Sequence, residues 1–196
     1  MKKFTSVFLT VLLIFSLSAC EIDLPWGSTI QVPPVTWYDA EVCYTGYSGD
    51  HSYWEYAYNN DKDAWVGMPI FKLESAGELA DFKENLKPYF SFNGKRYATP
   101  DTFTPTFNEV TAGYDDAFFA ENIVLVVYVQ ASSGTFRYRV ENTTVKNNAL
   151  IFTIDQYNDD GAHTCDMSGW LVVISISREA LDTNEIQSYH VQRSED

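Results

Sequence analysis

The stretch that most constrains the fold of this chain is an unbroken apolar run over residues 123–129, where β-branched and aromatic side chains fill most positions. Seven residues are too few to span a bilayer but suit a strand that is buried on both faces. A Ser-Ser-Gly segment at residues 132–134 interrupts the run, and apolar and polar side chains then alternate over residues 135–140. Such alternation is typical of a strand with one buried face. The pattern predicts a β-hairpin whose first strand lies at the centre of a sheet.

Further segments of strand length lie on both sides of this stretch. We expect strands over residues 41–45, 52–58, 68–73, 143–145, 150–154, 170–177 and 186–191, the last at a sheet edge. Residues 94–107 contain two prolines and predict a loop. Because strands outnumber helices and the later connections have hairpin length, we predict an α+β fold. It is a mainly antiparallel sheet or partly closed barrel with one packed amphipathic helix.

The packed helix is expected over residues 75–88. Ser75, followed three residues later by Glu78, fits a capping box, in which the two side chains satisfy free amides at the helix start. Apolar residues at spacings of three and four then form one face, namely Leu79, Phe82 and Leu86. A second, short helix is expected after an acidic cap at Asp115 or Asp116.

The N-terminus has the features of an export signal. Two lysines precede an almost entirely apolar segment at residues 4–17, which is too short for a spanning helix. The next motif, Leu17-Ser18-Ala19-Cys20, resembles the lipobox of bacterial lipoproteins, in which the cysteine thiol receives diacylglycerol and the bond before it is cut. The resemblance implies that residues 1–19 are a lipoprotein signal peptide and that Cys20 is lipidated. An ordinary secretory signal with a chance cysteine is the alternative.

The lipobox resemblance also implies where the protein resides. Acyl chains such as palmitate on Cys20 would add about 0.8 kcal/mol of membrane affinity per buried methylene. The expected location is the cell envelope, lipid-anchored on the extracytoplasmic face of a bacterial membrane, with the lipid bilayer as a partner. Residues 20–34 contain three prolines and a glycine and predict a tether. Residues 35–196 are long enough for a single globular domain with its own core.

The charge of the chain limits its partners. The net charge is −14, and loss of residues 1–19 would remove two lysines and no acid, which brings it near −16. Phosphate backbones and anionic lipid heads repel such a protein, so nucleic acid is not an expected partner. Cations, basic proteins and neutral glycans are compatible with this charge. The alternative explanation is that this charge simply keeps a surface protein soluble.

A second resemblance concerns the body of the chain. Residues 115–140 run from an acidic cap through a double Phe, an apolar strand and a Ser-Gly turn to an alternating strand. Continued through residues 150–154 and 170–176, this pattern is similar to the C-terminal domain of one component of a bacterial protease complex, a domain that many exported lipoproteins share. The resemblance implies a small exported α+β domain with no known catalytic residues, in one case tied to an extracytoplasmic protease.

Two cysteines remain once Cys20 is lipidated. Export places Cys43 and Cys165 where a disulfide can form, and closure of a loop of that length would stabilise the fold by about 4–5 kcal/mol in the chain-entropy model. Two separate buried thiols are the alternative. A catalytic cysteine would need a base such as a histidine, and no motif selects one.

Acidic residues crowd one loop late in the chain. The weak candidates for a metal site are Asp155, Asp159, Asp160 and Asp166. Calcium requires six to eight oxygen ligands, and Tyr157 stands where the EF-hand pattern requires an acid or an amide. A solvated turn explains the cluster, so we expect neither a metal nor another cofactor.

Aromatic residues are unusually frequent between residues 35 and 66. They could stack on sugar rings, bind a protein partner, or fill a core as a cross-strand ladder; the candidates are Trp37, Trp54, Tyr56, Tyr58 and Trp65. The chain has no nucleophile elbow, phosphate loop, zinc-protease motif or dinucleotide fingerprint. We therefore predict a non-enzymatic domain that binds an exported or envelope protein. The alternative is a carbohydrate-binding surface lipoprotein with an aromatic face. A hydrolase would require a buried carboxylate of raised pKa in a cleft.

Overall fold

The computed structural model of the protein describes residues 35–46, 68–99, 102–157 and 167–194. Within these ranges, no helix combines the length and the apolar character needed to cross a membrane. The elements follow one another as β1 (Tyr38–Tyr44), β2 (Ile70–Leu73), α2 (Ala76–Leu86), β3 (Tyr97–Thr99), β4 (Thr102–Phe103), α3 (Phe107–Val110), α4 (Asp116–Glu121), β5 (Asn122–Ala131), β6 (Arg137–Lys146), β7 (Ala149–Tyr157), β8 (Ser168–Ser177), α5 (Arg178–Thr183) and β9 (Ser188–Arg193).

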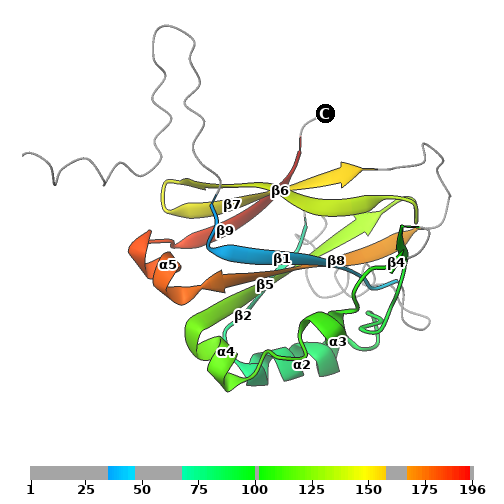
Figure 1. The fold of residues 1–196 in the computed structure, drawn as a ribbon, viewed down its shortest axis with the longest axis horizontal. Coiled ribbons are helices and arrows are strands. Elements are labelled where there is room, and N and C mark those ends of the chain that lie inside the picture. Colours follow the sequence, from blue (N-terminus) through cyan, green and yellow to red (C-terminus); the bar gives the residue numbers. More distant parts are fainter. Residues whose placement is uncertain (1–34, 47–67, 100–101, 158–166, 195–196) are drawn as a thin grey trace, which may run out of the picture.

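The strands form two sheets and a small ribbon (Figure 1). The four-stranded sheet has the order β1-β8-β5-β2 and is antiparallel throughout. The three-stranded sheet has the order β6-β7-β9, with an antiparallel β6–β7 pair and a parallel β7–β9 pair. The ribbon pairs β3 with β4. The predicted α+β fold with mainly antiparallel strands is confirmed, and the described strands do not close into a barrel.

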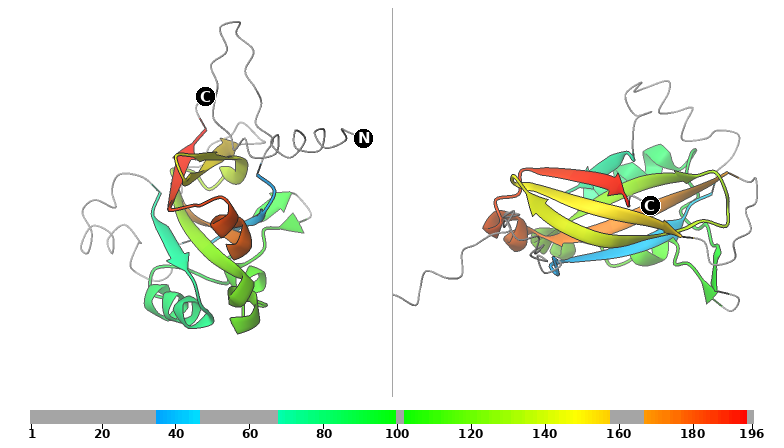
Figure 2. Two further views of the ribbon diagram at one scale, coloured as in Figure 1. Left: turned by 90° about the vertical axis from the view of Figure 1, so that its left-hand side faces the viewer. Right: turned by 90° about the horizontal axis from the view of Figure 1, so that it is seen from above.

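The four-stranded sheet lies between the other two layers, as the view from the side shows (Figure 2). Helix α2 and the short α3 and α4 cover one face, and the three-stranded sheet covers the other. Side chains of β5 alternate between two cores: Val124, Val126 and Tyr128 face the helices, whereas Ile123, Leu125, Val127 and Val129 face the three-stranded sheet. Both faces of β5 are therefore buried, which explains why its apolar run is unbroken.

Phenylalanines dominate the core beneath the helices. Phe82 of α2 lies with its ring centroid 5.6 Å from that of Phe107 and 5.8 Å from that of Phe92. The Ser75 side chain accepts a hydrogen bond from the Glu78 amide at 3.1 Å, as the capping pattern predicts. The return bond differs, because the Glu78 carboxylate accepts from the Glu74 amide rather than from the cap residue. The helix over residues 76–86 is confirmed.

The predicted hairpin between residues 123–129 and 135–140 is wrong. β5 pairs with β8 and β2, whereas β6 leaves this sheet and pairs with β7. A strand that is apolar on both faces buries most of its surface beside a strand of the same kind. In the described part of the chain, β8 is the strand whose burial pattern matches that of β5. β6 carries exposed polar side chains and fits only a one-sided layer.

The predictions for the helix cap and the last strand are confirmed, whereas the loop prediction is wrong in part. Asp115 caps α4, and the last strand, β9, lies at a sheet edge, as expected. The Asn147-Asn148 turn has both residues at positive φ, 52° and 61°, and joins β6 to β7. The predicted loop over residues 94–107 is wrong in part, because it contains the β3–β4 ribbon. The expected strand over residues 52–58 lies outside the described residues.

Candidate functional site

The outer edge of β1 is one of the strand edges that no other described strand covers, and it lies beside two hollows. β8 pairs with one side of this strand, and none of the other described strands pairs with the opposite side. β1 crosses the front of the molecule in Figure 1 and forms its outer margin in the view from above in Figure 2. An unpaired strand edge carries free amides and carbonyls that can template the addition of another strand.

The register shows which backbone groups are unpaired. The Thr45 amide donates to the Gly169 carbonyl at 3.0 Å, and the Ser177 amide donates to the Trp37 carbonyl at 3.4 Å. In an antiparallel ladder bonded positions alternate, so the odd-numbered residues of β1 bond to β8. The amides and carbonyls of the even-numbered residues point away from the sheet, above all those of Ala40 and Val42.

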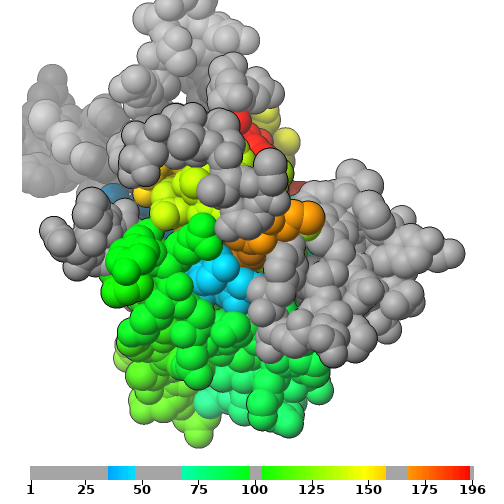
Figure 3. Space-filling model, turned by 90° about the vertical axis from the view of Figure 1, so that its right-hand side faces the viewer, coloured from blue at the N-terminus to red at the C-terminus, as the bar shows by residue number. Residues whose placement is uncertain are grey.

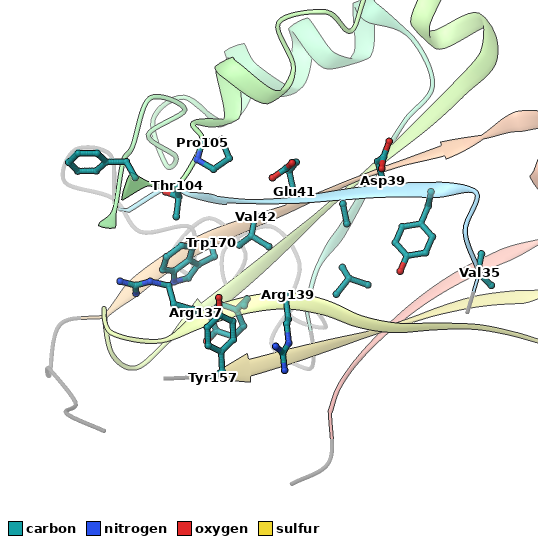
Figure 4. Close-up of a pocket in the computed structure, with 15 residues that line it drawn as sticks. Val35, Asp39, Glu41, Val42, Thr104, Pro105, Arg137, Arg139, Tyr157 and Trp170 are labelled. Carbon is teal, nitrogen blue, oxygen red and sulfur yellow. The ribbon is translucent and has the colours of Figure 1, made fainter. Parts of the chain in front are cut away.

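The side chains of β1 alternate independently of its hydrogen bonds. Asp39 and Glu41 are exposed and point toward the helix layer, whereas Val42 points toward the three-stranded sheet (Figure 4). Tyr38 and Val42 both pack against the core between the two sheets. Cys43 continues the helix-side row and is fully buried in the helix-side core. One edge strand therefore presents carboxylates on one side and apolar groups on the other.

A hollow of about 520 Å³ lies on the sheet side of β1. Its wall includes Arg137 and Arg139 of β6, Trp170 of β8, Tyr157 of β7 and Phe103 of the ribbon. Asp39 and Glu41 of β1 border it as well. The end of β1 lies between the green helix layer and the orange end of β8 in the space-filling view (Figure 3). We call the hollow of about 520 Å³ the sheet-side hollow.

The two arginines of this hollow are already engaged. The Arg137 guanidinium donates to the Tyr97 carbonyl at 2.7 and 3.1 Å and to the Gly134 and Phe136 carbonyls at 3.0 Å each. Arg139 pairs with Asp155 at 2.6 Å and lies 5.2 Å from the centroid of the Tyr157 ring. Arg137 therefore ties the ribbon to the three-stranded sheet, and Arg139 extends along its surface.

A second hollow, of about 510 Å³, lies on the helix side of β1. Its carboxylates are Asp39, Glu41 and Glu109, and its aromatic wall is a Tyr114–Phe118 stack with ring centroids 3.9 Å apart. We call it the helix-side hollow. Its carboxylates, combined with stacked rings, form a surface suited to a positively charged group.

Two groups of the helix-side hollow have shifted pKa values. The Glu109 carboxylate accepts hydrogen bonds from the Lys95 ammonium and from the Thr106 amide. These bonds, that from Lys95 first, lower the pKa of the Glu109 carboxyl to about 2. Burial raises the pKa of the Tyr114 hydroxyl, which hydrogen-bonds Ser175 and lies near the charge of Asp39. At neutral pH the carboxylate is therefore charged and the phenol is neutral.

An exposed aromatic pair stands at one end of the β1 edge. Tyr97 and Phe103 of the ribbon stack with centroids 4.5 Å apart, although they are 58% and 53% exposed. Stacked rings that remain this accessible are typical of contact residues rather than of core residues. Phe103 also lines the sheet-side hollow, so the pair is continuous with the edge.

The structure describes only part of the predicted aromatic site. Trp37 is half-buried and packs against the core between the sheets, which fits the core-filling alternative. The other candidates lie outside the described residues, namely Trp54, Tyr56, Tyr58 and Trp65.

The predicted metal and disulfide residues are also only partly described by the structure. Asp155 is held by Arg139, whereas Asp159, Asp160 and Asp166 lie outside the described residues. Among the side chains that the structure describes, no three potential ligands come together for a metal. Cys43 is fully buried. Its predicted bridge partner Cys165 and the lipidation candidate Cys20 lie outside the described ranges, so the bridge and the lipidation stay predictions.

The environment of Cys43 does not favour nucleophilic chemistry. Burial, followed by the charges of Glu41 and Glu109, raises the pKa of its thiol to about 12. A cysteine nucleophile reacts as a thiolate and requires the opposite shift. Cys43 is therefore a packing residue.

Sequence reasoning overlooked the residues that shape the β1 edge. The acids at residues 39 and 41 alternate with apolar positions, which marks a one-sided strand but does not show that the strand is unpaired. Tyr97 and Phe103 fall within a segment expected to be a loop. Comparison with protein-family models found no matching family, and comparisons with curated proteins and with solved structures found no significant match. The similarity to the protease-complex domain stays an interpretation of the sequence pattern.

Proposed function

We propose that this protein is a lipid-anchored interaction domain of the bacterial cell envelope, which binds an exported or envelope protein on the extracytoplasmic face. The observation that carries the proposal is the unpaired β1 edge, with a hollow on each side and an exposed aromatic pair at one end. We define the partner face as this edge together with Tyr97 and Phe103. The proposal assigns no catalytic residue.

Two features of the partner face support protein binding. Exposed aromatic rings supply large contact areas at low cost in side-chain entropy. Backbone groups at an open strand edge supply directional hydrogen bonds without a requirement for one particular sequence. The lipobox resemblance at Cys20 would concentrate the domain at a membrane surface, where other anchored or exported proteins pass.

Site-specific photocrosslinking on intact cells tests the proposal. The full-length chain carries benzoylphenylalanine in place of Phe103 or, as the control, in place of His190. His190 is exposed and lies on β9, the outer strand of the three-stranded sheet on the side opposite β6. We expect a discrete protein adduct from position 103 and none from position 190. Equal adducts from both positions, or no protein adduct from position 103, would refute the proposal.

Carbohydrate binding is the second candidate function, and the Tyr97–Phe103 pair is the observation that favours it. Exposed rings can stack on pyranose faces, and the pair lies beside a hollow with polar groups. If cell-wall or capsular glycans abolish the protein adduct and co-purify with the chain, this candidate replaces the first. Substitution Phe103→Ala would then reduce glycan retention.

A further inference from the structure

We propose that the β1 edge binds its partner by strand addition, and that the added segment carries basic side chains toward the helix layer and apolar side chains toward the three-stranded sheet. This inference rests on the proposed function and deepens it, because it specifies the chemistry of the partner segment. Three features of β1 carry it: the direction of its free backbone groups, the charge on one side, and the hollow on the other.

No other described strand bonds to the outward backbone groups of β1, although Gly94 packs against the Tyr44 carbonyl at one end. The even-numbered residues present their amides and carbonyls outward, with Ala40 and Val42 at the centre of the strand. A segment lying about 4.8 Å away would bond to these groups and continue the antiparallel sheet without displacing β8. Its side chains would then alternate between the helix side and the sheet side.

The helix side selects for positive charge. Asp39 and Glu41 are exposed, and no described cation forms an ion pair with either of them. Glu109, nearby in the same hollow, is by contrast paired with Lys95 at 2.8 Å. Side chains directly opposite on neighbouring strands approach to about 5 Å, so Lys or Arg of an added segment would reach Asp39 and Glu41.

The same charges disfavour a second copy of this chain on the edge. An antiparallel pair of β1 strands centred on Ala40 would place Asp39 of one copy opposite Glu41 of the other. Like charges directly opposite are destabilising, and each copy carries a net charge of −14. Charged side chains at an open edge are a known protection against self-association. The charge pattern therefore favours a basic partner over a homodimer.

The sheet side selects for apolar side chains. The lining of the sheet-side hollow includes Val42, Tyr157 and Phe103, and its arginines are engaged with backbone carbonyls or with Asp155. Asp39 and Glu41 also border this hollow, but their side chains point toward the helix layer (Figure 4). A valine or aromatic residue of the added segment would cover the apolar groups of the lining, whereas a carboxylate would compete with Asp155 for Arg139. The preferred segment thus alternates basic and apolar residues.

Amide hydrogen exchange on the full-length chain in non-ionic detergent tests this inference. The probe is a peptide of about ten residues in which lysine and valine alternate, a length that covers the whole edge. A peptide of alternating glutamate and valine is the control. We expect the Ala40 and Val42 amides to exchange rapidly in the free chain, unlike those of Glu41 and Cys43, and to become protected by the lysine peptide alone.

Matched variants separate the backbone contribution from the charge contribution. Ala40→Pro removes one outward amide and leaves the β8 ladder intact, whereas Ala40→Ser keeps the amide. We expect Ala40→Pro to weaken peptide binding about tenfold and Ala40→Ser to leave it unchanged. The double variant Asp39→Asn with Glu41→Gln should weaken binding about fivefold and reduce its salt dependence.

Each other outcome overturns the inference. If both peptides bind equally well, the edge does not select for basic side chains. If neither peptide binds, strand addition at this edge is wrong. Protection of Ala40 and Val42 in the free monomer would mean that another segment of this chain occupies the edge, and protection with dimerisation would identify a second copy. If crosslinking from position 103 persists in Ala40→Pro, the interaction function stands and only the strand-addition mode fails.

Discussion

Arg137 joins parts of the chain that the sequence does not connect. Its guanidinium binds the Tyr97 carbonyl, forty residues away, together with two carbonyls of the preceding turn, and lies 5.4 Å from the centroid of the Trp170 ring. A planar fork makes these contacts at once, and an ammonium group cannot. Ser75 and Asp115, which cap helices through neighbouring residues, are readable from sequence. The partners of Arg137 are not, because their approach depends on the fold.

Substitution Arg137→Lys should destabilise the fold by about 2 kcal/mol, because carbonyls of the ribbon and the turn lose a charged donor. Urea unfolding followed by tryptophan fluorescence measures this change. Arg139→Lys is the matched control, since Arg139 is 60% exposed and forms one ion pair. The loss of folding stability in Arg139→Lys should stay below about 1 kcal/mol. Equal losses in the two variants would contradict the role assigned to Arg137.

Cys43 should resist alkylation in the folded chain. A thiol with a pKa near 12 is ionised to about one part in ten thousand at pH 8, and its side chain is fully buried. Iodoacetamide should therefore label Cys43 only after unfolding in urea, as peptide mass mapping of the reduced protein can measure. The raised pKa also predicts a loss of stability as the pH rises from about 9 to 12, because only the unfolded thiol ionises there. Rapid labelling of the native protein would contradict this account.

At the scale of elements, local patterns identify strands better than they identify strand partners. The apolar run of β5 predicts burial on both faces correctly, because that property depends on the residues themselves. The hairpin prediction fails because pairing depends on which strands match in burial, and β8 begins 37 residues after the end of β5. β1 as an open edge is equally unreadable, since alternation reports a buried face and not a missing neighbour.

The β6–β7 hairpin offers a test at this scale. Asn147 and Asn148 both adopt positive φ, which favours Asn or Gly and strains other residues. Asn148→Ala should destabilise the fold by about 1 kcal/mol, whereas Asn148→Gly should be neutral or stabilising. The Asn148 carbonyl accepts from the Gln187 amide in either variant, so the backbone contact to the start of β9 is retained. Equal stabilities of the two variants in urea unfolding would contradict the turn assignment.

At the scale of the whole molecule, three layers explain where a partner could bind. The four-stranded sheet is covered on both faces, so its accessible backbone lies at its margins, and β1 is the longer of its two outer strands. The short β2, with four residues, offers a smaller edge at the opposite margin. The α+β class was predictable from strand patterns, whereas the order of layers follows from long-range pairing. The partner face arises from that order, and no sequence motif identifies it.

Anchoring by Cys20 would place this face at a membrane, and substitution of that residue tests the arrangement. Two or three acyl chains at about 0.8 kcal/mol per buried methylene hold a protein at a bilayer, and loss of the thiol removes them all. We expect alkyne-palmitate labelling and membrane fractionation of the full-length chain to be lost in Cys20→Ser and retained in Cys165→Ser. Without the anchor, crosslinking from position 103 should fall when the partner is itself membrane-bound, because the local concentration of the chain falls. Membrane association with palmitate labelling in Cys20→Ser would show that another residue carries the lipid.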